Sequence, residues 1–177
     1  MLSIKQPFDT LFLDRDGVLN RKIDDGYVLH PSEIEILPGI TEFLAWAGHV
    51  FSRIVVVTNQ RCVGRGLLTI SELNKVNSEI NKQTGSWIDK FYVCTHLNED
   101  ACSCRKPQKG LFLRATEEFN ICLNSSLMIG DSETDLIPAK EMGLSTIYIS
   151  AGTSPYADVT IKLTTELLPL LSSTIEG

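Results

Sequence analysis

The sequence has no cluster of basic residues and no long apolar run. Its 16 Lys and Arg residues are outnumbered by 22 Asp and Glu residues, which gives a formal net charge of −6. Surfaces that bind nucleic acid or membrane lipid need clustered positive charge, so we expect neither kind of partner. No apolar run approaches the length that a membrane-spanning helix requires.

Signals for export and for a second domain are also missing. The segment from Met1 to Thr10 carries a lone Lys5 and lacks the apolar core of a signal peptide, so we expect a cytoplasmic protein. No repeat, low-complexity tract or linker interrupts the 177 residues. This length is typical of one domain, and we expect residues 1–177 to form a single domain that acts as a monomer.

Short apolar segments rich in β-branched and aromatic residues alternate with helical patterns along the chain. Strands are expected at Thr10–Asp14, Arg53–Thr58, Lys90–Cys94, Ser126–Gly130, Ser145–Ile149 and Ala157–Ile161. Helices are expected at Ile40–Ala47, Ile70–Gln83, Gly110–Phe119, Asp135–Met142 and Thr165–Leu171. Gly48 is expected to end the first helix, and a capping box of Thr69 and Glu72 to begin the second. This alternation predicts a three-layer α/β fold around a central, mostly parallel sheet.

Reactive side chains follow three of the expected strands directly. Asp14 and Asp16 come after the first strand, Thr58 after the second and Asp131 after the fourth. Ligands in such folds bind beyond the carboxyl ends of the strands, so these residues are expected to share one pocket. Two carboxylates as close as Asp14 and Asp16 repel each other unless a cation joins them or one holds a proton. Mg²⁺ is the cation that suits oxygen ligands and a phosphate.

Other residues are of the types that bind or surround a phosphate. Thr58 and Asn59 offer a hydroxyl and free backbone N–H groups at a strand end, and Arg105 with Lys106 offer two cations. Asp135 opens an expected helix. Each feature alone has an ordinary explanation, such as a common strand exit, a solvated surface pair or an acid favoured by the helix dipole. Only their combination indicates chemistry on a phosphate.

A cluster of soft metal ligands precedes the two cations. Cys94, His96, Cys102 and Cys104 lie within eleven residues, a spacing compact enough to surround one tetrahedral ion. Three thiolates and one imidazole match a structural Zn²⁺ site, whose closed shell leaves no position for catalysis. The alternative is two unrelated pairs of buried cysteines. Because Lys106 follows the last ligand closely, zinc would fix the loop that presents Arg105 and Lys106.

In this order the motifs resemble the haloacid dehalogenase superfamily of phosphotransferases: DxDG, a Thr after the second strand, a Lys, and GDxxxD. The resemblance extends from Asp9 to Gly152. It implies a Rossmann-like fold, with Asp14 as the nucleophile that becomes an aspartyl-phosphate and Asp16 as the general acid and base.

The same resemblance implies roles for the surrounding residues. Mg²⁺ would be held by the Asp14 carboxylate, the Asp16 backbone carbonyl and Asp131, with Asp135 orienting these ligands from behind. Thr58, Asn59 and Lys106 would bind the oxygens of the transferred phosphoryl group.

A narrower resemblance comes from the Cys/His segment followed by Cys-Arg-Lys-Pro. It is similar to the D-glycero-D-manno-heptose-1,7-bisphosphate 7-phosphatases and to their relatives, the histidinol-phosphate phosphatases. Asp25-Gly26-Tyr27-Val28 and Arg65-Gly66 look more like the heptose branch. That branch implies a sugar bisphosphate that loses its 7-phosphate during nucleotide-heptose synthesis for lipopolysaccharide or another surface glycan. Arg105 and Arg65 would then recognise the sugar phosphate. The sequence departs from the family at Arg61-Cys62, where small residues are usual, and at Ser132, where a basic residue is common.

Loops are expected to set the specificity. The intervals between Asp16, Thr58 and Lys106 leave no room for an inserted cap domain, so the segments Asn20–Pro38 and Arg61–Leu68 and the zinc loop would form the rim.

Three other functions stay open. Histidinol phosphate or another small phosphomonoester would change the substrate alone, and a cationic amine would require an additional carboxylate. A polynucleotide 3′-phosphatase would require a basic groove. An inactive, zinc-stabilised interaction module would have no need for clustered acids.

Overall fold

A parallel sheet forms the centre of the molecule. The computed structural model describes residues 6–175, so the first five residues of the segment considered above as a leader lie outside the described part. The strand order is β3-β2-β1-β4-β5-β6, and every neighbouring pair is parallel. The strands are β1 (Thr10–Leu13), β2 (Arg53–Asn59), β3 (Lys90–Cys94), β4 (Leu127–Gly130), β5 (Ser145–Ile149) and β6 (Val159–Ile161).

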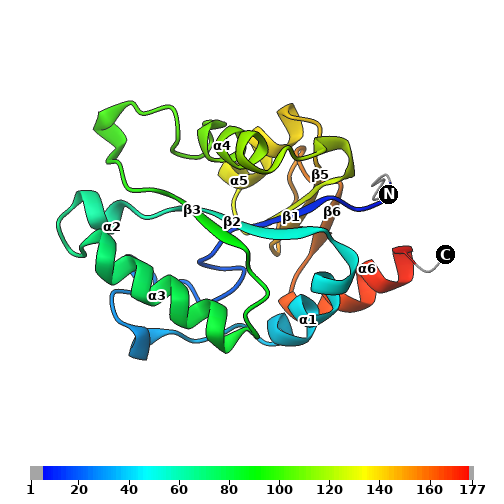
Figure 1. Ribbon diagram of the computed structural model, residues 1–177, viewed down its shortest axis with the longest axis horizontal. Helices are drawn as coiled ribbons and strands as arrows, with labels where there is room; N and C mark the ends of the chain where they lie inside the picture. Colours follow the sequence, from blue (N-terminus) through cyan, green and yellow to red (C-terminus); the bar gives the residue numbers. More distant parts are fainter. Residues whose placement is uncertain (1–5, 176–177) are drawn as a thin grey trace.

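Helices cover both faces of this sheet. In Figure 1, α1, α3 and α6 lie on one side, and α4 and α5 lie on the other. The α-helices are α1 (Ile40–Val50), α2 (Arg61–Gly64), α3 (Ile70–Gln83), α4 (Gly110–Phe119), α5 (Glu133–Glu141) and α6 (Leu167–Ile175). Short 3₁₀ helices occur at Pro31–Glu33, Asn98–Asp100, Leu123–Ser125 and Thr164–Glu166. The three-layer α/β architecture predicted from the sequence is confirmed, and residues 6–175 contain no inserted cap domain.

The alternation of side chains along β1 explains why both faces need a cover. Leu11 and Leu13 pack into the larger core with α1 and α6, whereas Phe12 points to the opposite core beside Phe112 of α4. Successive side chains of a strand point to opposite faces, so an apolar strand of this kind is stable only between two layers of helices.

The ends of the helices largely follow the local sequence. Thr69 and Glu72 form the expected capping box of α3, in which the Thr69 side chain accepts a hydrogen bond from the Glu72 backbone. Helix α5 begins at Glu133, earlier than expected, because the Ser132 hydroxyl accepts a hydrogen bond from the Thr134 backbone and caps it. The prediction that Gly48 ends α1 is wrong, since the helix continues to Val50.

None of the helices in the described residues is suited to span a membrane, because none has both the length and the apolar character needed to cross a bilayer.

Candidate active site

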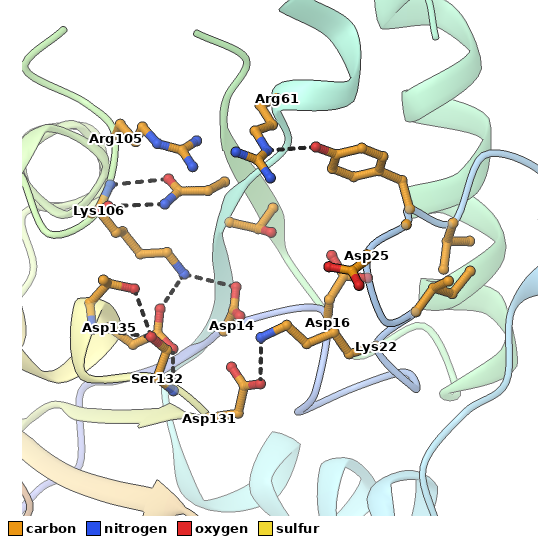
Figure 2. A pocket seen from close by; sticks show the side chains of 17 residues that line it. Asp14, Asp16, Lys22, Asp25, Arg61, Arg105, Lys106, Asp131, Ser132 and Asp135 are labelled. Carbon is orange, nitrogen blue, oxygen red and sulfur yellow. Dashed lines mark hydrogen bonds and ion pairs between the residues drawn. The ribbon is translucent and has the colours of Figure 1, made fainter. Parts of the chain in front are cut away.

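The carboxyl ends of the strands open into one cavity of about 390 Å³. β1 delivers Asp14 directly, β2 ends in Thr58 and Asn59, and β4 is followed by Asp131. Because β1 lies between β2 and β4, these strand ends are neighbours in space. Figure 2 shows the side chains converging from the different loops. The sequence-predicted residues that line the cavity are Asp14, Asp16, Thr58, Asn59, Arg105, Lys106, Asp131 and Asp135.

A buried lysine links two of the carboxylates. Lys106 Nζ lies 2.8 Å from Asp14 Oδ1 and 2.6 Å from Asp135 Oδ1, and it also donates to the Val57 carbonyl at 2.6 Å. Burial alone would lower the pKa of Lys106, but the charges of Asp135 and Asp14 outweigh it and raise the pKa. Burial raises the pKa of Asp135 to about 7, with Asp14 adding to the rise and Lys106 opposing it. The lysine is therefore a fixed cation at the floor of the cavity.

Asp131 has one oxygen in use and one without a partner. Its Oδ2 accepts a hydrogen bond from Lys22 Nζ at 3.1 Å, whereas its buried Oδ1 has no partner among the described residues. Burial and the Asp14 charge raise the pKa of Asp131. One oxygen each of Asp14, Asp131 and Asp135 lies within 4.8 Å of the others. A hard divalent cation such as Mg²⁺ fits this set of donors, because it would satisfy the unpaired oxygen and relieve the repulsion.

Gly17 is required where it stands because the chain passes so close to Asp131. Its φ of 98° lies in the left-handed region, and a Cβ at this position would lie 2.2 Å from Asp131 Oδ2. Only glycine permits both this backbone conformation and this approach. The DxDG motif therefore uses its glycine to bring the turn after β1 against the residue that follows β4.

Asp16 is held by three side chains. The fully buried Arg15 donates from Nε and Nη2 to the two carboxylate oxygens, at 3.2 and 3.0 Å. Asn20 Nδ2 donates at 2.9 Å and Gln60 Nε2 at 2.7 Å. Burial by itself would raise the pKa of Asp16, but the Arg15 charge and these hydrogen bonds hold it below its ordinary value. The Asp16 carboxylate is thus fixed in one orientation and kept ionised.

The Asn59 side chain is bonded to the backbone of Lys106 and is not free to bind a ligand with the same atoms. Its side-chain nitrogen donates to the Lys106 carbonyl at 3.1 Å, and its oxygen accepts from the Lys106 backbone N–H at 3.0 Å. This pair of hydrogen bonds fastens the segment that carries Arg105 and Lys106 to the end of β2. Arg105 lines the cavity, and its buried Nη1 has no partner among the described residues.

Arg65 does not lie where the resemblance suggested. It is absent from the cavity lining, and its guanidinium carbon lies 5.9 Å from the centre of the Tyr27 ring. Arg61 lines the cavity in its place, because the short helix α2 starts immediately after β2 and turns Arg61 inward. The structure therefore places Arg61, and not Arg65, in the lining of this cavity.

The sequence reasoning placed the loop Asn20–Pro38 at the rim, and Lys22, Asp25 and Tyr27 of this loop line the cavity. It missed Gln60, which follows Asn59 and orients Asp16. Arg61, which the sequence analysis noted as a departure from the family pattern, is one of the residues that line the cavity. No comparable signal marks Lys22, whose partner Asp131 is 109 positions away in the sequence.

The four soft ligands gather as expected from their spacing. Sulfur-to-sulfur distances are 3.7 Å for Cys94–Cys102 and 3.6 Å for Cys102–Cys104, and His96 Nδ1 lies 3.2 Å from the Cys104 sulfur. Zn–S bonds of about 2.3 Å in a tetrahedron place the sulfurs roughly 3.8 Å apart, so the arrangement fits zinc. The alternative of two unrelated buried cysteine pairs does not describe this cluster, in which His96 is exposed and Cys102 and Cys104 are partly exposed.

Comparisons with known proteins identify the family to which the chain belongs. A family model described as HAD-hydrolase-like matches residues 103–167. The D-glycero-beta-D-manno-heptose-1,7-bisphosphate 7-phosphatase of Helicobacter pylori is 39% identical over 131 residues, which cover 72% of this chain and 75% of that protein. The chain belongs to the heptose-bisphosphate phosphatase family of haloacid dehalogenase-like hydrolases. A further member, the D-glycero-alpha-D-manno-heptose-1,7-bisphosphate 7-phosphatase of Mycobacterium bovis, is 40% identical over 136 residues, covering 71% of this chain and 68% of that one.

A solved structure from the same family shares the fold. The D,D-heptose 1,7-bisphosphate phosphatase from B. bronchiseptica, crystallised with magnesium and phosphate, matches with a TM-score of 0.82 and 26% identity. The match covers 94% of this chain and 99% of the other. The superfamily, the Rossmann-like fold and the assignment as a phosphatase, all predicted from the sequence, are confirmed.

Proposed function

We propose that the protein is a Mg²⁺-dependent phosphomonoesterase that works through an aspartyl-phosphate on Asp14. The observation that carries this proposal is the arrangement at the cavity floor: Asp14 beside the buried Lys106, with the unpaired Asp131 oxygen nearby. Mg²⁺ held by Asp14, the Asp16 backbone carbonyl and Asp131, with Asp135 behind them, would neutralise charge on the phosphoryl group.

The reaction divides between two carboxylates. An oxygen of Asp14 attacks phosphorus in line, and the ester P–O bond breaks as Asp16 gives a proton to the leaving oxygen. Asp16 is ionised in the free protein, so it must take up this proton when the phosphate dianion binds beside it and raises its pKa. In the second step Asp16 accepts a proton from water, and the water oxygen displaces Asp14 from phosphorus. Thr58 and Lys106 stabilise the transferring oxygens throughout.

The substrate that we propose is D-glycero-D-manno-heptose 1,7-bisphosphate, which would lose its 7-phosphate on the route to nucleotide-heptose. Supporting this, the related H. pylori and M. bovis proteins carry this activity in their names, for the β and α anomers respectively. The unpartnered Arg105 is suited to recognise the sugar phosphate. We further propose that the Cys/His cluster holds structural Zn²⁺ and that the enzyme is a cytoplasmic monomer without a nucleic-acid partner.

One observation favours a second candidate, histidinol phosphate. Asp25 lines the cavity, and it supplies the additional carboxylate that a cationic amine would require. However, Arg61, Arg105 and Lys22 line the same cavity. Three cations suit a leaving group that carries a second phosphate better than they suit histidinol, which is a cationic amine. The bisphosphate therefore remains the better candidate.

A phosphate-release assay with both heptose 1,7-bisphosphate anomers, histidinol phosphate and a 3′-phosphorylated oligonucleotide tests the proposal. We expect Mg²⁺-dependent turnover with a preference for one bisphosphate, and loss of turnover by roughly 10³-fold or more in Asp14→Asn. Preference for histidinol phosphate would replace the substrate and keep the mechanism. Turnover retained in Asp14→Asn would refute the nucleophile assignment.

A further inference from the structure

Arg61 lies at the rim of the cavity in a defined orientation. Its Nε donates a hydrogen bond of 2.5 Å to the Tyr27 hydroxyl, and its guanidinium carbon lies 5.9 Å from the centre of the Tyr27 ring. Tyr27 comes from the loop after DxDG and Arg61 from α2, so this contact joins two segments that both line the cavity. The arginine is therefore positioned before any ligand arrives.

The remaining donors of Arg61 are free to bind a ligand. Within residues 6–175, only Nε has a hydrogen-bond partner, and no carboxylate pairs with the Arg61 guanidinium. Figure 2 shows this guanidinium facing that of Arg105 across the upper part of the cavity. Arg105 also has no ion-pair partner in the described part of the chain, and its Nη1 is buried without a hydrogen bond. Two cations facing each other without an anion repel, so the arrangement calls for an anionic group between them.

The reacting phosphate does not fill this position. Its attachment point is Asp14, which lies with Lys106 at the floor of the cavity, below the two arginines in Figure 2. A substrate with a single phosphate at Asp14 would leave the two guanidinium groups unpaired. A substrate with a second anionic group would satisfy them.

We propose that Arg61, held in place by Tyr27, determines specificity by binding the non-reacting phosphate of a bisphosphate. The inference rests on the proposed function and adds Arg61 to the residues that recognise the substrate. Tyr27 acts as a positioning residue, because its hydroxyl uses the Nε donor and leaves the two terminal nitrogens for the ligand.

Arg65 provides a matched control. It contacts the same Tyr27 ring at the same 5.9 Å, yet it is absent from the cavity lining. Arg65→Met removes an equal charge and a similar contact without removing a cavity donor. Tyr27→Phe removes the hydroxyl that accepts from Arg61 and keeps the ring.

The experiment compares substrate pairs that differ only by the second phosphate: heptose 1,7-bisphosphate against heptose 7-phosphate, and fructose 1,6-bisphosphate against fructose 6-phosphate. We expect Arg61→Met to lower kcat/KM for the bisphosphates roughly 10- to 100-fold through KM, as for the loss of charged hydrogen bonds, and to change monophosphate turnover less than about twofold. Tyr27→Phe should raise KM for the bisphosphates by a smaller factor at unchanged kcat, and Arg65→Met should match the wild type.

The outcomes separate the inference from the proposed function. A wild type that prefers bisphosphates and an Arg61→Met variant that keeps this preference would overturn the inference alone. Equal losses on bisphosphates and monophosphates would also overturn it, since Arg61 would then serve the common phosphate or the fold. If the wild type prefers no bisphosphate in either pair, the inference is again wrong. Monophosphate turnover that disappears in Asp14→Asn would still support the phosphatase mechanism.

Discussion

Replacement of Lys106 by methionine tests the charge balance at the cavity floor. The Lys106 side chain is 2% exposed and contacts Asp14 and the equally buried Asp135. Methionine keeps the length and most of the volume, so the main change is the loss of a buried positive charge. Removing one partner of a buried ion pair costs about 3–5 kcal/mol, because the other charge is left uncompensated. For a chain of this size that corresponds to a fall in Tm of roughly 6–20 °C.

The pH dependence of this loss follows from Asp135. Burial holds its folded-state pKa, about 7, above the ordinary value of 3.8, so the folded state binds the proton more tightly than the unfolded state. The resulting cost is absent below about pH 4 and grows as the pH rises through the folded pKa. With a folded pKa of about 7, Asp135 is already protonated at pH 5, where Lys106 has one charge fewer to balance. At pH 8 Asp135 is ionised beside Lys106, and without the lysine it must either keep an unpaired buried charge or take up a proton at a cost in free energy. The loss in Tm should therefore be smaller at pH 5 than at pH 8.

Thermal unfolding followed by circular dichroism at both pH values measures the effect. Lys109→Met is the control, because Lys109 pairs with Glu141 at the surface, with both side chains 41% or more exposed. An exposed pair contributes about 1 kcal/mol or less, so the control should stay within roughly 4 °C of the wild type. A Lys106→Met variant with wild-type Tm at pH 8 would refute the buried-charge explanation. Equal losses at both pH values would attribute the effect to packing.

Two further predictions concern the metal sites. Gly17→Ala places a methyl group 2.2 Å from Asp131 Oδ2 and should reduce the rise in Tm on adding Mg²⁺. Gly66→Ala is the control, because Gly66 also has a positive φ, 71°, but no atom lies within 4 Å of its Cβ. It should carry a similar backbone cost of about 1–2 kcal/mol and keep the full Mg²⁺ response. Cys104→Ser should lower both the zinc content measured by atomic emission and the Tm, whereas Cys122→Ser, at an exposed cysteine, should leave both unchanged. An intact Mg²⁺ response in Gly17→Ala, or full zinc in Cys104→Ser, would contradict these assignments.

Predictions from the sequence were most accurate where the propensity of the local residues agrees with their position in the folded sheet. The run Ile54 to Val57 predicts β2 because β-branched residues favour strands, and it is buried on both faces as a central strand must be. The capping box at Thr69 marks the start of α3 because its two hydrogen bonds depend on residues three apart. The parallel sheet then brings the strand ends together, so the sequence alone predicts that Asp14, Thr58 and Asp131 share one pocket.

The errors arose where contacts between distant segments decide the structure. Gly48 was expected to end α1, but its missing side chain serves packing: a Cβ there would lie 2.2 Å from the Trp87 ring. Arg65 was expected at the substrate because it resembles a family position, and only the turn of α2 shows that Arg61 faces the cavity. Neither the packing of Trp87 nor the direction of a one-turn helix is encoded within a short window of sequence.

The separation between a buried floor and an exposed rim has an evolutionary consequence. Lys106 and Asp135 are enclosed by the sheet and its helices, whereas Lys22 and Asp25 stand in solvent on the loop after DxDG. Substitutions at exposed positions usually change stability by about 0.5 kcal/mol or less, far below the cost of disturbing the buried charges. Selection can therefore exchange rim residues almost freely and acquire a new substrate in few steps, while the phosphoryl-transfer chemistry is inherited unchanged. Arg61, on the short helix α2 at the cavity, is a position where such an exchange would alter substrate binding without touching Asp14 or Lys106.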